Sequence, residues 1–165
     1  TANGLRAGAY HRAFASGGNR RRAKADARRE ARVFVRSVGG VVRGDLRPVL
    51  DVETPFTRLN ARRLRLWIRT WLKRVERKTG VRPMIYTNAS SWAATGDTRR
   101  FARRNYRLWV ANFGVDEPAV PAGNWAGAGW AVWQHTSTGS VRGISGNVDK
   151  NKLGVPIAKI TARPR

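Results

Sequence analysis

The stretch "RPVLDVET", residues 47–54, places two carboxylates at the end of a short apolar run. Side chains two positions apart in an extended strand point the same way. Asp51 and Glu53 are therefore expected to share one face, about 6.5 to 7 Å apart at the backbone. Two ionised carboxylates at this spacing repel each other, so the pKa of one of them should rise.

A carboxylic acid that keeps its proton beside an ionised carboxylate is the arrangement that cleavage of a glycosidic bond needs. The acid protonates the leaving oxygen, while the other group stabilises or attacks the cationic centre or positions water. The alternative interpretation is that both acids merely pair with arginines, because the chain holds 33 Lys and Arg against 10 Asp and Glu. The spacing alone is compatible with both interpretations.

The segments around this stretch alternate between strand and helix patterns. Apolar residues recur three and four positions apart over 23–38 and again from about 60 to 78, which predicts two helices. Short strand-like runs fall within 5–15 and at 48–52, 83–87 and 106–113. We therefore predict βαβ units around a parallel sheet, in a single domain that spans residues 1–165. The runs at 129–138 and 143–151 have no helix between them and predict antiparallel strands that close one edge.

The predicted strands end in polar and aromatic residues. In parallel α/β proteins the functional side chains gather at the carboxyl ends of the strands. The candidates for substrate binding are therefore Tyr10, His11, Tyr86 and Asn112. Aromatic side chains suit sugars, whose rings present flat C–H faces, and this adds the indoles of Trp109 and Trp133. The alternative for any single tryptophan is a place in the core.

The composition limits the classes of partner. A net charge of +23 and a pI of about 12 favour polyanions, which include nucleic acid, anionic lipid and the anionic polymers of a bacterial wall. The chain has no cysteine and only two histidines, so neither a disulfide framework nor a metal site is expected. No apolar run approaches the roughly 18 residues of a membrane span. Interleaved Arg and Trp could bind single-stranded nucleic acid, although no recognisable nucleic-acid motif supports this.

Five segments, taken in their order and spacing, resemble glycoside hydrolase family 25, the Chalaropsis-type lysozymes or N-acetylmuramidases. The resemblance covers about residues 4 to 154, and the ending of the last segment is specific in combination with the Asp-x-Glu pair. The segments are "GAYHRAF" (8–14), "RPVLDVE" (47–53), "TGVRPMIYTNASSW" (79–92), "RLWVANFG" (107–114) and "AVWQHTSTGSVRGISGNVDKNKL" (131–153).

This resemblance implies a TIM-like (β/α)5β3 barrel with antiparallel closing strands. It also implies hydrolysis, without a metal or other cofactor, of the β-1,4 bond between N-acetylmuramic acid and N-acetylglucosamine in peptidoglycan. Glu53 resembles the family's proton donor, Asp51 its ionised partner that stabilises the reaction or orients the substrate's N-acetyl group, and Asp149 a further acid on the rim. The expected partners are peptidoglycan glycan strands and, through charge, anionic wall polymers, at an extracellular or cell-wall location. Positions of the substrate groove are matched by Tyr10, Tyr86, Trp109, Trp133 and Gln134.

The chain also departs from the family pattern. Members normally begin with a strand that carries an Asp-x-Ser-x-x-Gln motif, then a helix and a second strand, and none of these has a counterpart here. We therefore expect an N-terminally incomplete barrel that lacks two of eight strands and the first-strand Asp. Arg12 stands where the family usually has Phe, and His135 replaces a common aromatic residue.

Three explanations for the departures stay open. The chain is a fragment, a degenerate member that binds without cutting, or a protein completed by a partner chain. A wall-binding protein with compromised catalysis and a cationic binder of nucleic acid or other polyanions are accordingly the alternative functions.

Overall fold

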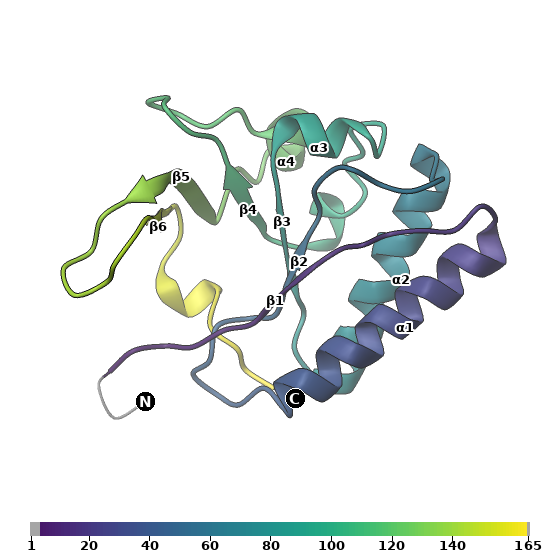
Figure 1. Ribbon diagram of the computed structural model, residues 1–165, viewed down its shortest axis with the longest axis horizontal. Helices are drawn as coiled ribbons and strands as arrows, with labels where there is room; N and C mark the ends of the chain where they lie inside the picture. The colour runs from purple at the N-terminus through teal and green to yellow at the C-terminus, as the bar shows by residue number, and fades with distance from the viewer. Residues whose placement is uncertain (1–3, 165) are drawn as a thin grey trace.

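Six strands form one sheet, in the order β1–β2–β3–β4–β5–β6, in the computed structural model, which describes residues 4–164 (Figure 1). The first five strands are parallel, and the last pairs antiparallel with the fifth, as the sequence predicted. Among the described residues β1 and β6 are the two edges, so the sheet is open, and the TIM-like barrel implied by the resemblance stays a prediction. The strands are β1 (Tyr10–Arg12), β2 (Val49–Asp51), β3 (Met84–Thr87), β4 (Leu108–Ala111), β5 (Val132–Gly139) and β6 (Val148–Leu153).

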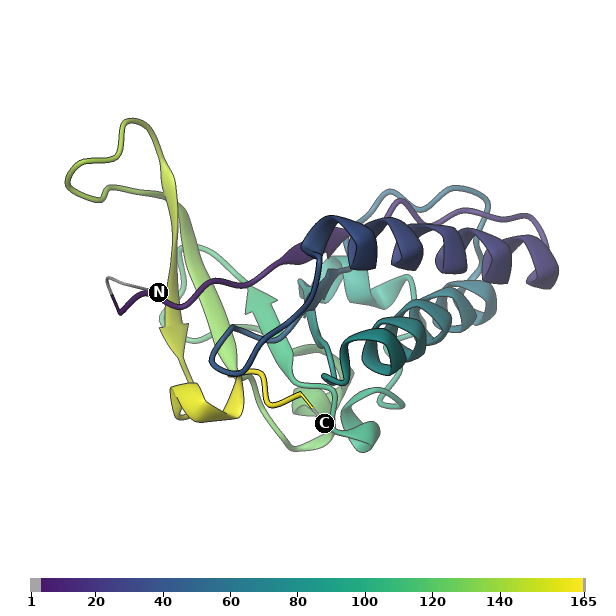
Figure 2. The ribbon, with the colours of Figure 1, turned by 90° about the horizontal axis from the view of Figure 1, so that it is seen from below.

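Two long helices, α1 (Arg20–Val38) and α2 (Ala61–Thr79), lie side by side and follow β1 and β2 respectively (Figure 2). Asparagine caps begin them: Asn19 Oδ1 accepts from Arg22 N–H at 2.9 Å, and the side chain of Asn60 caps α2 in the same way. Glycines in the left-handed conformation end them, with φ of 67° at Gly39 and 69° at Gly80. Because each helix starts after a strand ends, both N-termini lie toward the carboxyl edge of the sheet.

Shorter helical segments complete the connections. They are α3 (Ala89–Ala93), η1 (Ala102–Arg104), α4 (Pro121–Ala126) and η2 (Ile157–Lys159). In α4 the backbone from Ala122 to Trp125 has φ of 51° to 59°, a left-handed turn that the sequence did not predict. Left-handed conformations are unfavourable for residues other than glycine, and the buried Trp125 ring, which donates to Tyr106 O at 2.7 Å, offsets this cost. Within residues 4–164, no helix combines the length and apolar character that crossing a membrane requires.

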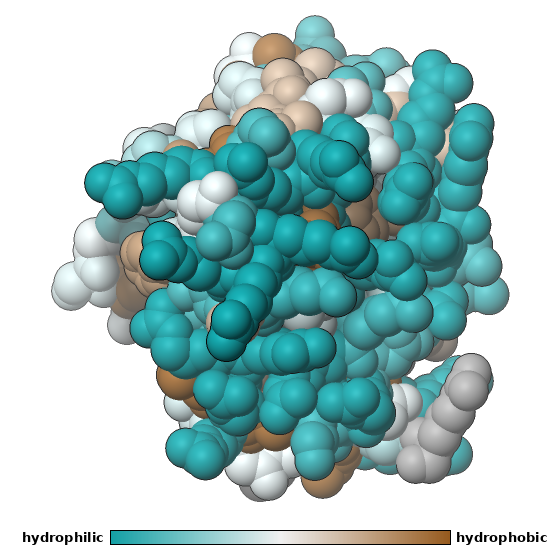
Figure 3. Space-filling model, turned by 90° about the vertical axis from the view of Figure 1, so that its right-hand side faces the viewer, coloured by the Kyte–Doolittle hydropathy of each residue, from teal (hydrophilic) through white to brown (hydrophobic). Residues whose placement is uncertain are grey.

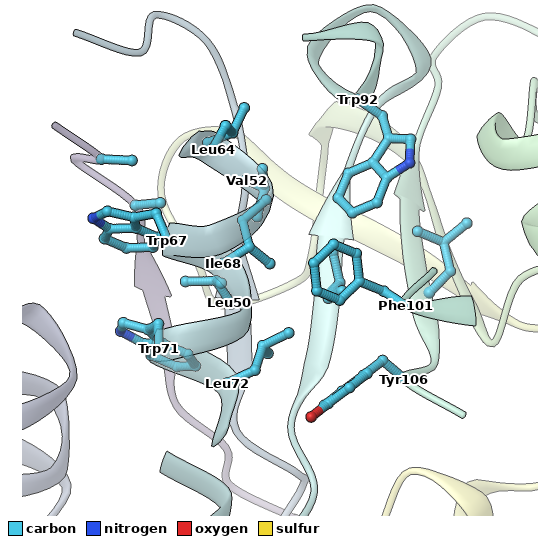
Figure 4. Close-up of a cluster of buried hydrophobic side chains, with 14 of the residues drawn as sticks. Leu50, Val52, Leu64, Trp67, Ile68, Trp71, Leu72, Trp92, Phe101 and Tyr106 are labelled. Atoms are coloured by element: carbon cyan, nitrogen blue, oxygen red, sulfur yellow. The ribbon is translucent and has the colours of Figure 1, made fainter. Parts of the chain in front are cut away.

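The main core lies between one face of the sheet and the helical segments that cover it, which are α3, η1 and α4 as well as the two long helices (Figure 4). Trp67 and Trp71 of α2 are fully buried there, together with Leu50 and Val52 from β2 and the residue that follows it. Large aromatic rings contribute several kcal/mol each to such a core, so this contact fixes how β2 is turned about its axis. Since side chains alternate along a strand, burying residues 50 and 52 directs residues 51 and 53 to the opposite face.

Candidate active site

A cavity of about 220 Å³ lies at the carboxyl edge of the sheet, on the face that the helices do not cover. Each of the six strands contributes a residue to its wall, and the segment after β2 adds Glu53. All of the lining residues are ones that the sequence had singled out, so the structure brings seven of the ten candidates together. They are Tyr10, Asp51, Glu53, Tyr86, Trp109, Gln134 and Asp149.

Asp51 is the most enclosed acid of this cavity. Asp51 as a whole is only 6% exposed, and its Oδ1 is buried without a hydrogen-bond partner among residues 4–164. Burial, and then the charge of Glu53, raise the pKa of Asp51 to about 7, although Arg12 and His11 act in the opposite direction. Asp51 is therefore a carboxyl group that exchanges its proton near neutral pH and has an acceptor oxygen free for a ligand.

Glu53 is more open and has polar partners. Its Oε1 accepts from Asn88 Nδ2 at 3.2 Å, and its Oε2 lies 3.4 Å from Arg12 Nη1. Asn88 is held in place because its Oδ1 also caps α3 by accepting from Ser91 N–H at 2.8 Å. The arginine pairing that sequence reasoning offered as an alternative therefore holds for Glu53 alone, through one long contact, and the cavity beside it stays open.

The aromatic wall of the cavity is fixed by side-chain hydrogen bonds. Tyr86 OH donates to Gln134 Oε1 at 2.8 Å, and Trp109 Nε1 donates to Asn151 Oδ1 at 2.8 Å. The rings of Tyr86 and Trp109 meet edge to face with their centroids 5.2 Å apart. Burial, followed by the charges of Glu53, Asp51 and Asp149, raises the pKa of Tyr86, so its phenol remains a protonated donor.

Three candidate residues lie elsewhere. His11 faces the helices, where its Nε2 is 2.8 Å from Glu30 Oε2 and its ring stacks on Trp71. Trp133 belongs to the core, and its Nε1 donates to Asn112 O at 2.8 Å. The Asn112 side chain accepts from the backbone of the following loop, at Ala119 N–H. None of the three lines the cavity, and we do not include them in the site proposed below.

Three further residues at the site were not identified as site residues from the sequence. Arg12 and Asn88 contact Glu53, and Asn151 orients Trp109. Two of them had a usable signal, because Asn88 directly follows β3 and Asn151 lies two positions after Asp149 on the same face of β6. Arg12 lies two positions after Tyr10 and directly opposite Asp51 in the β1–β2 register.

The chemistry of the cavity is that of carboxyl groups beside aromatic surfaces. Among the described residues there is no group of three His, Cys, Asp or Glu side chains arranged to hold a metal ion. Proton transfer by the Asp51 and Glu53 pair and stacking on Tyr10 and Trp109 are the capacities that these side chains provide.

Comparison with known proteins gives consistent relatives. The family model described as glycosyl hydrolases family 25 matches residues 1–144. Lysozyme M1 of Streptomyces globisporus is 36% identical over 169 residues, which cover 96% of this chain and 53% of that protein. The N,O-diacetylmuramidase of Chalaropsis sp. is 32% identical over 127 residues, which cover 69% of this chain and 59% of that protein.

A solved structure shares the fold as well as the sequence. The bacterial lysozyme of Streptomyces coelicolor superimposes with a TM-score of 0.74 at 35% identity, over 93% of this chain and 69% of that one. The chain spans about half the length of the curated relatives it matches, such as Lysozyme M1. On the match of the family model over most of its residues, the chain belongs to glycosyl hydrolase family 25.

Proposed function

We propose that the cavity hydrolyses the β-1,4 bond between N-acetylmuramic acid and N-acetylglucosamine in bacterial peptidoglycan, as a muramidase. The observation that carries this proposal is the pair of carboxyl groups, Asp51 and Glu53, in a cavity with aromatic walls, where burial raises the pKa of Asp51 to about 7. The names of the relatives, a lysozyme and a diacetylmuramidase, support the choice of substrate.

In this proposal the two carboxyl groups hold one proton between them near neutral pH. The raised pKa of Asp51 leaves the shared proton mainly on that residue in the free protein, whereas the resemblance gives the role of donor to Glu53. A sugar ligand can reverse this distribution. An N-acetyl N–H that donates to the unpartnered Asp51 Oδ1 stabilises the ionised form of Asp51 and so moves the proton to Glu53.

Glu53 is suited to deliver that proton because its side chain is the more open of the two, at 23% exposure against a residue exposure of 6% for Asp51. It protonates the oxygen of the glycosidic bond as the bond to the sugar C1 breaks. Ionised Asp51 stabilises the positive charge that develops on the sugar. Water then adds to C1, and the proton it releases returns to the carboxyl pair, which restores the starting state.

The remaining cavity residues bind and orient the sugar in this proposal. Tyr10 is 66% exposed at the mouth and offers a ring face, while Trp109 is held by its bond to Asn151. Asp149 adds an acceptor on the wall opposite β1. The place of action that follows is the bacterial cell wall, outside the membrane.

The proposal is tested by replacing Glu53 and measuring loss of turbidity of a peptidoglycan suspension, together with the new reducing ends released. Glu53→Gln should lower the rate by about 100- to 10,000-fold, the usual contribution of a positioned general acid. The matched control is Glu117→Gln, in the exposed loop between β4 and α4, which should retain the wild-type rate. Equal rates for Glu53→Gln and wild type would show that the cavity is not the hydrolytic site.

A further inference from the structure

A second hollow of the molecule lies on the other side of the core, between α1 and α2. Its upper part, at the N-terminal ends of the helices, has a volume of about 650 Å³, and its lower part has about 550 Å³. Arg20, Leu66 and Arg69 line both parts, so the two hollows adjoin, and we name them together the helix groove. Figure 3 shows this side of the molecule covered by long hydrophilic side chains.

Cationic side chains dominate the lining of the helix groove. Six cations line the upper part and eight line the lower part, and Arg20 and Arg69 belong to both, so twelve different Lys and Arg side chains take part. Within residues 4–164, no Asp or Glu lines either part. The groove therefore concentrates more than a third of the 33 basic residues of the chain.

The acids of the two helices do not neutralise this charge. Glu30 and Glu76 pair with His11 and Arg82, respectively, and neither of these partners lines the groove. The remaining acid, Asp26, contacts Arg29 and the indole of Trp67. In the described part of the chain, none of the four ion pairs involves a cation of the helix groove. A channel with this many unpaired like charges has a strongly positive potential, which attracts an anionic ligand.

The spacing of the cations suits a linear ligand. Basic residues recur every four positions along α1, at Arg20, Lys24, Arg28 and Arg32. At a rise of 1.5 Å per residue this is about 6 Å from one charge to the next, along a helix about 28 Å long. The facing row on α2 includes Arg69, Lys73 and Arg77. A flexible chain with a negative charge every few ångströms can meet both rows at once.

The upper end of the groove adds the fields of two helix termini. The N-termini of α1 and α2 lie there, beside Asn19 and Asn60, and neither helix has an acidic residue in its first turn. The positive end of each helix dipole is therefore not compensated locally and adds to the attraction for anions. In the lower part, Arg74 Nε is buried and has no hydrogen-bond partner among residues 4–164.

We propose that the helix groove binds a linear polyol-phosphate polymer of the bacterial wall, at a site separate from the cavity. The charge rows fit any flexible polyphosphate chain, but nucleic acid is the weaker choice. No aromatic side chain lines the groove among the described residues, and Trp67 and Trp71 of α2 are fully buried, so bases find no ring on which to stack. The choice of a wall polymer as the source of the phosphates rests on the proposed function, whereas the groove itself does not.

The test measures binding of fluorescent poly(glycerol phosphate) to the full chain at 0.1 M salt. The groove variant is Arg28→Gln, Arg69→Gln and Lys73→Gln, and all three side chains are exposed. The control variant is Arg43→Gln, Arg103→Gln and Arg163→Gln, which lowers the net charge equally at exposed positions outside the groove. The groove variant should bind about 100-fold more weakly. Each lost phosphate contact removes about 0.7 from the slope of log affinity against log salt, as for single-stranded nucleic acid, which at 0.1 M salt is about fivefold per contact. The control should lose less than about 5-fold, and equal losses in both variants would overturn the proposal.

Two further measurements complete the test. With the wild-type protein, the polymer should protect Arg28 and Arg69, but not Arg103, from an arginine-selective reagent, and uniform protection counts against the groove. An oligothymidylate with the same number of phosphates should bind no more tightly than the polymer, and tenfold tighter binding would overturn the choice of ligand in favour of nucleic acid.

Hydrolysis of a soluble glycan fragment separates this proposal from the muramidase proposal. Both triple variants should retain the wild-type rate, because they leave the cavity unchanged. A wild-type protein that binds the polymer in the groove but does not hydrolyse the fragment supports the groove and refutes the proposed function. Slower hydrolysis in the groove variant alone would overturn the separation of the two sites.

Discussion

The cavity and the helix groove use charge in opposite ways on opposite sides of one core. The cavity holds three acids, and burial of Asp51 beside Glu53 raises the pKa of Asp51 to about 7. The groove holds twelve cations, many of them exposed, and none has an ion-pair partner among residues 4–164. The one buried acid of the cavity, Asp51, changes its protonation state near neutral pH, which suits proton-transfer chemistry. Many hydrated charges keep their state and act through the field that they produce together, which suits attraction.

The largest expected effect concerns the buried charge of the cavity. The pKa of Asp51 is raised in the folded protein, so the native state binds the extra proton, and the stability this provides is present below about pH 4 and lost as the pH rises through 7. The free energy of unfolding should fall over this range by up to about 4 kcal/mol, at about 1.4 kcal/mol per pKa unit. Asp51→Asn should remove the fall.

Urea unfolding of wild type and Asp51→Asn at pH 4, 6 and 8 checks this expectation. The two proteins should be similar at pH 4, and the variant should be more stable at pH 8. Binding of the anionic polymer to the helix groove should not change. Parallel stability curves for the two proteins would mean that Asp51 ionises normally in the folded protein.

A smaller effect is expected at Glu30, an acid that lines neither the cavity nor the helix groove. Glu30 of α1 is buried, and its Oε2 accepts from Phe14 N–H at 3.2 Å and lies 2.8 Å from His11 Nε2. Glu30→Ala leaves both groups unpaired and should destabilise the fold by about 2 to 3 kcal/mol at pH 7.

The matched control for Glu30→Ala is Asp116→Ala, which removes an exposed acid from the loop after β4 and should change stability by less than about 0.5 kcal/mol. Thermal melting measures both variants. If Glu30→Ala were as stable as its control, the contact between β1 and α1 would not depend on this carboxylate.

The smallest expected effect comes from the cation nearest the acid pair. Arg12 lowers the pKa of Asp51, so Arg12→Leu should raise that pKa further and move the alkaline limb of the activity profile to higher pH. The maximal rate should change by less than about threefold, since Arg12 contacts Glu53 only at 3.4 Å. Arg103→Leu, at an exposed position of η1 that does not line the cavity, should leave the profile in place. A downward movement with Arg12→Leu would contradict the assigned electrostatics.

Local patterns in the sequence were enough for the order of the elements and for the placement of the acid pair. Three- and four-residue periodicity predicted α1 and α2 to within a few residues, because both helices bury one stripe and expose the other. The shared face of Asp51 and Glu53 followed from strand alternation, and the group of side chains at the strand ends followed from the predicted parallel order of the strands. These features depend on neighbours along the chain.

Features that depend on contacts distant in sequence could not be predicted. His11 faces the helices because its imidazole pairs with the Glu30 carboxylate and stacks on the Trp71 ring. Trp133 can lie in the core because its indole N–H donates to Asn112 O. Strand alternation places Trp109, and likewise Gln134, on the face opposite to that of its immediate neighbours in the chain. It does not tell which of the two faces packs against the core. Charge repulsion predicted that the pKa of one of the two acids would rise, but not that it would be Asp51, because the main cause, burial, appears only in the packed structure.

Val52 gives the segment around the acid pair an unusual intolerance to changes of length. Its side chain is fully buried, while the residues on either side of it face the cavity. Inserting or deleting one residue before Asp51 would exchange the two faces, placing both carboxylates in the apolar interior and an aliphatic group at the reaction centre. Substitutions here alter the protein by degrees, but a shift of one position removes the stability and the chemistry together.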